Sequence, residues 1–216
     1  MKFSTSIRHA VFAGVLVAAG TSVLAVPAVA SAAPVTETRR VADPVADEAN
    51  RALALLTTAA ETGDTSMQEA YEHVRAEIAG AIADRLGLDA AQLNVAWAKA
   101  DVDHQKALMA ALGQMGVPYR RNSSKPGISF DCSGLTTYAW SQAGFALQRS
   151  SGSQIRSAAP VTPDTAQAGD LVQYPGHVMM WLGVDRAIVH SPQAGRTVEV
   201  DVLSNRHRLR FGDPTA

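Results

Sequence analysis

The sequence has little of several features that define common classes of protein. It contains one cysteine in 216 residues, which excludes a disulfide framework and a cysteine-rich zinc site. Neither sign of charge is in excess, with 19 Lys and Arg against 20 Asp and Glu, so nothing indicates a nucleic-acid partner. Hydrophobic residues make up 47% and charged residues 18%, which excludes disorder over the whole length. We therefore expect a globular protein with a single thiol.

The N-terminus has the order of features that is typical of a secretory signal peptide. Lys2 and Arg8 precede an apolar run over residues 10–24, and the small-residue triplet Ala30-Ser31-Ala32 follows. The run is shorter than the roughly 20 residues that span a membrane, although an uncleaved anchor is the alternative. We expect residues 1–32 to be removed, leaving no stable membrane anchor and a protein that is secreted or held in the cell envelope.

Export makes the single thiol, Cys132, informative. Secreted proteins usually pair their cysteines or lack them, so an unpaired one indicates an intermolecular bond or a reactive group. The alternative is a buried thiol that serves as a small hydrophobic residue. The residues around the thiol must decide between these possibilities.

Three segments of different composition follow the predicted signal peptide. Residues 33–47 are polar and contain two prolines, which is typical of a linker. Residues 48–101 are rich in alanine, and their apolar residues recur at helical spacing, which predicts a helical N-terminal region. Residues 102–216 show a different pattern and form the predicted second domain.

Little in the helical region indicates chemistry. Ser66 followed by Glu69 predicts a capping box at the start of one helix, and Gly87 predicts its end. His73 and His104 are lone histidines on predicted helices, where a surface or packing role is expected rather than metal ligation. Such a region could bind a partner, cover a cleft or support the next domain.

Residues 102–216 are expected to form an α+β domain. A short helix starts at Cys132 and ends before Gly144, and beyond Pro160 apolar residues recur with the period of strands. The breaks between these strands are short and contain glycine or proline, so the sheet should be antiparallel. Four strands are predicted, over residues 171–174, 177–182, 187–190 and 197–202. A helix followed by a meander of strands is an α+β arrangement.

Cys132 lies at the N-terminal end of the predicted helix. The unpaired N–H groups and the dipole of a helix N-terminus favour an anion, and thiolate is the nucleophilic form of cysteine. The same N–H groups can stabilise an oxyanion that develops on an attacked carbonyl. A nucleophile also needs a base within hydrogen-bond reach, and the base needs a third group that orients it.

His177 and His190 lie in neighbouring predicted strands. If the turn between the strands is the four residues 183–186, Met179 pairs with His190 and His177 lies diagonal to it on the same face. One imidazole could then act as the base while the other fixes its tautomer. A five-residue turn would place the two on opposite faces, and the alternative is a pair of unrelated strand histidines.

Residues 103–202 carry a series of short motifs. They occur in the order Gly116-Val117-Pro118-Tyr119, Phe130-Asp131-Cys132-Ser133-Gly134-Leu135, Arg149-Ser150-Ser151-x-x-Gln154, Gly169-Asp170-Leu171-Val172, Gly176-His177-Val178 and Ile188-Val189-His190. In composition, order and spacing this series resembles the NlpC/P60 family of cell-wall peptidases. The Gly-Asp-Leu motif is a weak signal by itself, whereas Asp-Cys-Ser-Gly followed by Gly-His-Val and a further histidine is a strong one.

The resemblance implies a circularly permuted papain-like fold, in which a helix that carries the cysteine packs on an antiparallel sheet. By position, Cys132 would be the nucleophile, His177 the base and His190 the orienting residue. The substrate would be the peptide stem of peptidoglycan, commonly cut at the bond between D-γ-glutamate and a diamino acid. Neither a metal nor another cofactor is implied.

The resemblance also implies three substrate-binding residues. Tyr119 and Asp131 match positions near the nucleophile, where they would line the oxyanion region and contact the polar end of the substrate. Ser151 matches a position in the substrate groove.

The chain departs from the family pattern at two places near the site. Arg121-Asn122-Ser123 stands where the family usually has an aromatic residue and two glycines, which leaves the groove wall and the specificity open. Only Pro175 and Gly176 separate Tyr174 from His177, so this loop is shorter than usual and the entrance is expected to be more open.

Two other functions are compatible with these residues. One is a wall-binding module whose activity is latent, or gated by the helical region that precedes the site. The other is an amidase similar to the CHAP type, which also uses Cys and His but generally has Glu or Asn as the third group.

Overall fold

The computed structural model describes residues 39–205 and 208–216. The predicted signal peptide lies outside the described residues, as do residues 33–38 of the linker predicted for residues 33–47. Within the described residues, every helix is too short or too polar to cross a membrane.

The first helix starts inside the segment that was predicted to be a linker. α1 (Pro44–Thr62) begins at a proline, which suits the first helical position because its missing N–H would have no partner within the helix. Asp43 caps the helix, with Oδ1 accepting from the Val45 amide at 3.0 Å. The predicted linker boundary was therefore wrong, since residues 44–47 are helical.

α2 (Thr65–Leu86) is capped by Asp64. The Asp64 carboxylate accepts from the Ser66 amide at 2.8 Å, so it takes the place that the sequence assigned to a Ser66 cap. The predicted capping box at Ser66 and Glu69 was wrong because an aspartate upstream reaches the same first-turn amides. The predicted end is confirmed, since Gly87 has a φ of 70° and closes the helix.

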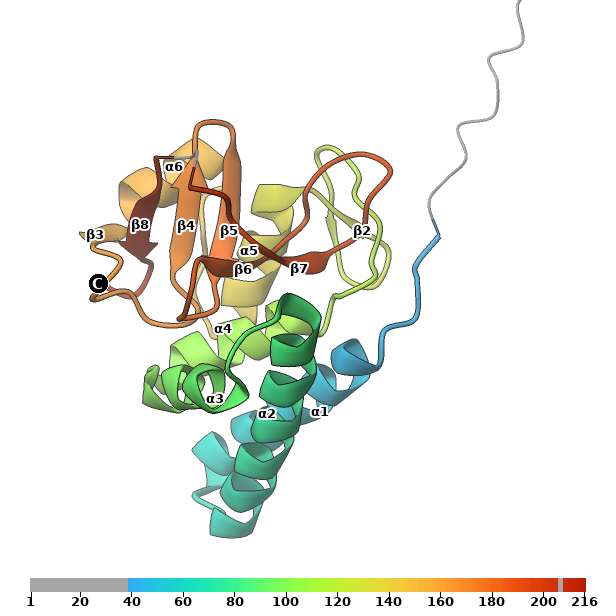
Figure 1. Ribbon diagram of the computed structural model, residues 1–216, viewed down its shortest axis with the longest axis vertical. Coiled ribbons are helices and arrows are strands. Elements are labelled where there is room, and N and C mark those ends of the chain that lie inside the picture. The colour runs from blue at the N-terminus through green and yellow to red at the C-terminus, as the bar shows by residue number, and fades with distance from the viewer. Residues whose placement is uncertain (1–38, 206–207) are drawn as a thin grey trace, which may run out of the picture. The chain divides into compact units, whose positions relative to one another are not determined.

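Two further helices complete the helical part. α3 (Ala90–Lys99) is capped by Asp89, and α4 (Val102–Leu112) follows after a short break. α1 packs against α2 and α4, and α2 packs against α3. Figure 1 shows these helices gathered below the strands.

The strands form a six-stranded antiparallel sheet in the order β3-β8-β4-β5-β6-β7. The four predicted strands are confirmed, although β7 begins two residues later than predicted and β5 ends one residue earlier. Their bounds are β4 (Leu171–Tyr174), β5 (His177–Trp181), β6 (Ala187–His190) and β7 (Glu199–Val202). The sequence did not predict β3 (Ala159–Val161), β8 (Arg210–Asp213) or a separate two-stranded ladder of β1 (Ser124–Lys125) and β2 (Ser129–Phe130).

Two helices accompany the sheet. α5 (Cys132–Gln142) packs against β5 on one side and against α4 on the other, so it lies between the sheet and the helical part. α6 (Ser151–Ser157) contacts β4 and β5 and was not predicted. The predicted α+β fold, with a helix that carries the cysteine packed on an antiparallel sheet, is confirmed (Figure 1).

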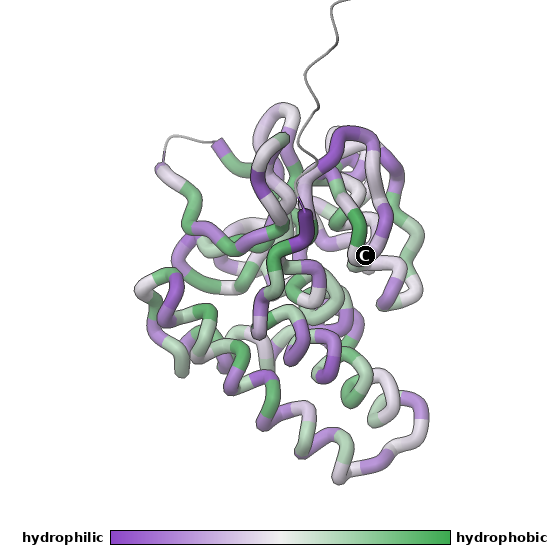
Figure 2. Tube along the Cα trace, turned by 90° about the vertical axis from the view of Figure 1, so that its right-hand side faces the viewer, coloured by the Kyte–Doolittle hydropathy of each residue, from purple (hydrophilic) through white to green (hydrophobic). Residues whose placement is uncertain are grey.

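The helical part and the sheet share one hydrophobic core. Buried residues from α1 to β6 belong to a single cluster, and the indole N–H of Trp97 in α3 donates to the Leu182 carbonyl at 2.8 Å. Figure 2 shows hydrophobic and hydrophilic positions alternating along the long helices, as expected for helices with one buried face. The helices therefore form one packed body with the sheet.

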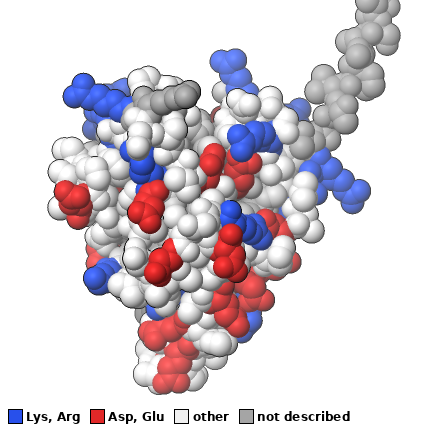
Figure 3. Space-filling view, in the orientation of Figure 1, with Lys and Arg blue, Asp and Glu red and all other residues white. Residues whose placement is uncertain are grey.

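Charged side chains are unevenly distributed over the face seen in Figure 3. Acidic side chains gather over the helical part at the bottom, whereas Lys and Arg lie mainly over the strands and loops above. The basic side chains are scattered on this face.

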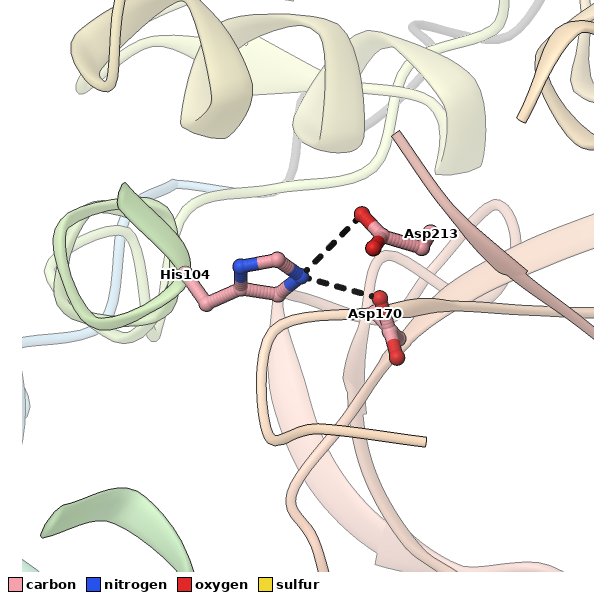
Figure 4. A group of neighbouring side chains, drawn as sticks. All are labelled: His104, Asp170 and Asp213. Atoms are coloured by element: carbon pink, nitrogen blue, oxygen red, sulfur yellow. Dashed lines mark hydrogen bonds and ion pairs between the residues drawn. The ribbon is translucent and has the colours of Figure 1, made fainter. Parts of the chain in front are cut away.

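His104 connects α4 to the sheet (Figure 4). Its Nε2 lies 3.0 Å from Oδ1 of Asp170, just before β4, and 3.4 Å from Oδ1 of Asp213 in β8. The imidazole is fully buried and meets the Trp140 ring edge-on, with 4.9 Å between the centroids. His104 is thus a buried residue that faces two carboxylates rather than the lone histidine that the sequence indicated, whereas His73 is exposed and pairs with a glutamate on the same helix.

Candidate active site

Cys132 is the first residue of α5, where a helix presents unpaired backbone N–H groups. Asp131 precedes it with extended backbone angles and caps the helix, its Oδ1 accepting from the Gly134 amide at 2.7 Å. The amides of Cys132 and Ser133 lie at the open end of the helix. The thiol is free and partly exposed. The predicted position of the thiol at the start of the helix is confirmed.

Arg149 and Gln154 fix the start of α5. The Arg149 guanidinium binds both carboxylate oxygens of Asp131, with Nη1–Oδ1 at 3.0 Å and Nη2–Oδ2 at 2.8 Å. It also donates to the Ser133 hydroxyl at 2.9 Å. Gln154 in α6 donates to the Ser133 carbonyl at 3.0 Å and accepts from the Thr136 hydroxyl at 2.7 Å. The motif Arg149-Ser150-Ser151-x-x-Gln154 thus holds the helix that carries the thiol.

His177 and His190 face each other across β5 and β6. Nε2 of His177 lies 2.9 Å from Nδ1 of His190, and the two residues are only 7% and 6% exposed. The strands pair Met180 with Val189, which is the register that follows from a four-residue turn. The predicted juxtaposition of the two imidazoles is therefore confirmed.

The contact between the imidazoles indicates a different role for each ring nitrogen of His177. Because Nε2 faces His190, Nδ1 is the nitrogen left to exchange a proton with a nucleophile. Burial, and next the charge of His190, lower the pKa of His177 to about 4. The ring is therefore neutral near pH 7, in the form that accepts a proton.

Several contacts bring the two histidines close to Cys132. The hydroxyl of Ser191, the residue after the second histidine, donates to the Phe130 carbonyl at 2.9 Å, two residues before the thiol. The Tyr174 ring lies 5.3 Å from the His177 ring between centroids. Burial, and next the charge of Cys132, raise the pKa of Tyr174, so this ring is near both groups. The structure thus gathers the three predicted catalytic side chains in one region.

The three predicted substrate-binding residues lie in different settings. Burial, and then the negative charges of Cys132 and Asp131, raise the pKa of Tyr119, which places this phenol near the thiol. The Asp131 carboxylate is engaged by the helix cap and by Arg149, a structural role that the sequence did not indicate. Ser151 is the partly exposed first residue of α6. Substrate binding by all three stays a prediction.

The two departures from the family pattern have distinct local structures. In the first, the buried Ser123 accepts from the Asp131 amide through its carbonyl at 2.9 Å, so it supports the residue before the thiol. In the second, Tyr174 pairs directly with His177, and Gly176 has a φ of 88°, as a two-residue turn requires. The short loop is thus a tight hairpin.

Two groups of described side chains are close enough to hold a metal ion. One is His104 with Asp170 and Asp213, and the other is His190 with Glu199 and Asp201. In the first group His104 already faces both carboxylates, and in the second His190 already contacts His177. The prediction that no metal is needed stays a prediction.

Sequence reasoning missed one charged group beside the histidines. Glu199 lies directly opposite His190 in the β6–β7 ladder, and its Oε1 lies 3.5 Å from His190 Nε2. Arg196 forms an ion pair with this glutamate. The predicted strands would pair His190 with Thr197, which shares a strand face with Glu199, but β7 begins two residues later and brings Glu199 itself opposite His190.

Comparison with known protein families supplies the identification of this region. A family model described as the NlpC/P60 family matches residues 116–210. This segment belongs to the NlpC/P60 family. The NlpC/P60 match includes Cys132, both histidines and the strand that carries Glu199, whereas α1 to α4 precede it.

Relatives of the NlpC/P60 segment include named endopeptidases. A probable endopeptidase of Mycobacterium tuberculosis is 38% identical over 101 residues, covering 45% of this chain and 26% of the relative. The peptidoglycan endopeptidase RipB of the same species is 36% identical over 99 residues, covering 38% of this chain and 41% of the relative. The chain thus spans less than half the length of these relatives.

A solved structure is also similar. The P60 domain of an antigen from Mycobacterium avium subspecies paratuberculosis is 25% identical, with a TM-score of 0.48, and the match covers 53% of this chain and 96% of that domain.

Proposed function

We propose that the protein is an exported cysteine peptidase that hydrolyses the stem peptides of peptidoglycan at the bond between D-γ-glutamate and a diamino acid. The observation that carries the proposal is the arrangement of a thiol at a helix N-terminus beside a hydrogen-bonded pair of buried histidines. The NlpC/P60 match and relatives named endopeptidases, one of them a peptidoglycan endopeptidase, support the same chemistry.

The reaction begins with Cys132 and His177. The thiol gives its proton to Nδ1 of His177, and the sulfur attacks the amide carbon of the substrate. Charge develops on the carbonyl oxygen, where the backbone N–H groups at the start of α5 stabilise it. Such a donor contributes about 3–4 kcal/mol in acyl transfer.

The intermediate then collapses to products. His177 returns its proton to the leaving amine, so that a thioester to Cys132 and a free amino group result. A water molecule next gives a proton to His177 and attacks the thioester, which releases the acid and regenerates the thiol. Throughout, His190 holds the Nε2 side of His177 and shares the positive charge that forms on it.

A digest of purified diaminopimelate-type peptidoglycan tests the proposal. The chain from residue 33 onward and its Cys132→Ala variant are incubated with the polymer, and released fragments are identified by mass spectrometry. We expect fragments that end at D-glutamate from the first protein only. Loss of the thiol should reduce the rate at least about 10³-fold, because the whole acyl-transfer route depends on it.

Other results of the digest would lead to other functions. Fragments cut between the glycan and the stem would indicate an amidase instead. Binding to the polymer without cleavage by either protein would indicate a wall-binding module. Replacing His190 by Asn bears on the amidase alternative, because the related amidases generally carry Glu or Asn as the third group.

Regulation by the helical part also stays a proposal. α2 packs against β7, the strand that carries Glu199, so the helices contact the sheet close to the site. Residues 48–101 would gate the activity if a movement of these helices changed the position of β7.

A further inference from the structure

Beyond the three residues of the proposed mechanism, Glu199 stands behind the histidine pair. The β6–β7 register places it directly opposite His190, and its Oε1 is 3.5 Å from His190 Nε2. His190 Nε2 is buried and makes no hydrogen bond within the described part of the chain. The distance between these two atoms exceeds the usual N–H···O range by a few tenths of an ångström. A small movement of the carboxylate would therefore complete a hydrogen bond.

Proton positions connect this carboxylate to the base. If Nδ1 of His177 is to accept a proton, the neutral ring must carry its hydrogen on Nε2, which then donates to His190 Nδ1. His190 must therefore carry its own hydrogen on Nε2, and that N–H points at Glu199. Only one tautomer of each ring is compatible with a base at His177.

Two neighbouring residues decide how Glu199 is held. Arg196 forms an ion pair with the Glu199 carboxylate, which limits its rotation. Asp201 is the other acid near His190, but it lies opposite Ile188, and its Oδ1 accepts from the Val202 amide at 2.8 Å. Glu199 is thus the carboxylate with both the register and the orientation to face His190.

We propose that Glu199 is a positioning residue that accepts the Nε2–H of His190, and thereby fixes the tautomers that leave His177 Nδ1 free to take the proton of Cys132. No proton moves onto Glu199, because its carboxylate only stabilises the positive charge that His177 and His190 share when the thiol ionises. This inference rests on the proposed function, since it concerns the same nucleophile.

The test uses the rate at which iodoacetamide alkylates Cys132, measured from pH 5 to 9 in the chain from residue 33 onward. Alkylation reports thiolate formation and needs no substrate. We expect Glu199→Ala to react about tenfold more slowly than the parent near pH 7, the lower end of the loss seen when a partner behind a metal-bound histidine is removed. Glu199→Gln keeps an oxygen acceptor without the charge and should fall between them.

Two further variants separate a specific role from a general effect. Glu48→Ala removes a glutamate that forms an equivalent i,i+3 ion pair with Arg51 on α1, and its alkylation rate should match the parent. Asp201→Ala removes the competing acid, and we expect a smaller loss than for Glu199→Ala. An equal loss in both acid variants, or an unchanged rate in Glu199→Ala, would overturn the assignment.

A spectroscopic readout covers the case in which the alanine variant does not fold. The ¹⁵N chemical shifts of the imidazoles distinguish the two neutral tautomers, and the parent should show His190 protonated on Nε2. In Glu199→Gln a mixture of His190 tautomers should appear, and a parent protonated on Nδ1 would contradict the inference. A parent that shows the expected tautomer and alkylation but leaves peptidoglycan uncut would overturn the proposed function alone.

Discussion

At the scale of single residues, the position of Cys132 depends on a glycine two residues further along α5. A Cβ on Gly134 would lie 2.0 Å from the Ser123 carbonyl oxygen and 2.9 Å from Oδ1 of Asp131. Ser123 belongs to the segment that replaces the aromatic and glycines of the family pattern. The close packing between this segment and the helix therefore requires that residue 134 has no side chain.

We predict that Gly134→Ala destabilises the fold and displaces the nucleophile. The free energy of unfolding should fall by about 1–3 kcal/mol, because the backbone carbonyl must move to make room. Urea denaturation measures this loss, and slower alkylation of Cys132 would report the displacement. Gly80→Ala is the control: a Cβ there meets nothing within 4 Å on α2, so stability should rise by about 0.5–1 kcal/mol. Equal stability changes in the two variants would contradict the prediction.

Residue-scale predictions from the sequence succeeded where spacing alone decides the outcome. The four-residue turn fixed the register that brings His177 to His190. The role of Asp131 was not predictable in the same way, because its partner Arg149 is distant in sequence and only the fold brings the two together. Glu199 was not predicted because a glutamate near a sheet edge is usually solvated. Only its pairing with His190 on the neighbouring strand indicates a role.

At the scale of elements, the consecutive strands of the meander were found, and two strands that are distant from each other in sequence were not. β4 to β7 follow one another along the chain and are separated by recognisable turns, whereas β3 and β8 pair with each other at long range. α6 has seven residues and is mostly polar, so it carries little helical periodicity. Local signals therefore located the centre of the sheet and missed one of its edges.

His104 joins three of these elements, and its charge makes their packing depend on pH. Burial lowers the pKa of His104, but the hydrogen bond to Asp170 and the charges of Asp170, Asp213 and Asp101 outweigh this effect and raise it above 6.5. Two carboxylates face one imidazole, so the protonated ring is the favoured form.

We predict that this cluster stabilises the protein most at mildly acidic pH. Because the folded pKa exceeds the unfolded value of 6.5, the contribution is complete below 6.5 and is lost as the pH rises through the folded value. Urea denaturation from pH 5.5 to 9 measures this contribution as the difference in stability between the parent and His104→Gln, because His177, with its pKa of about 4, adds an opposite slope to both proteins. The variant should be less stable than the parent by about 2 kcal/mol at pH 5.5, and the difference should shrink as the pH rises. A slope unchanged in the variant would assign the pH dependence to other groups.

At the scale of the whole described chain, the shared hydrophobic core determines how the helical part behaves. Leu56, Ile78 and Leu93 belong to the same buried cluster as Leu135 and Val189. A segment that contributes to the core cannot leave the sheet without exposing apolar surface. Each Å² of apolar surface exposed to water costs a free energy of roughly 25 cal/mol. Gating by detachment of the helices would therefore cost much of the stability.

We predict that a chain lacking residues 44–99 does not fold normally. It should aggregate or melt without a cooperative transition, whereas the chain from residue 33 onward should unfold in one transition. Circular dichroism and size-exclusion chromatography measure both properties. A monomeric deletion variant with a sharp melt and a normal alkylation rate at Cys132 would show that the sheet domain is independent of the helices.

The indole of Trp97 also gives the molecule an optical signal at this junction. Its ring is fully buried, while its N–H donates to the carbonyl of Leu182, the residue that follows β5. If α3 moved away from the strand, water would reach the ring and its emission would shift to longer wavelength. Fluorescence of a chain in which Trp140 and Trp181 are replaced by Phe would then follow the contact between helices and sheet when the proposed substrate is added, with no added label.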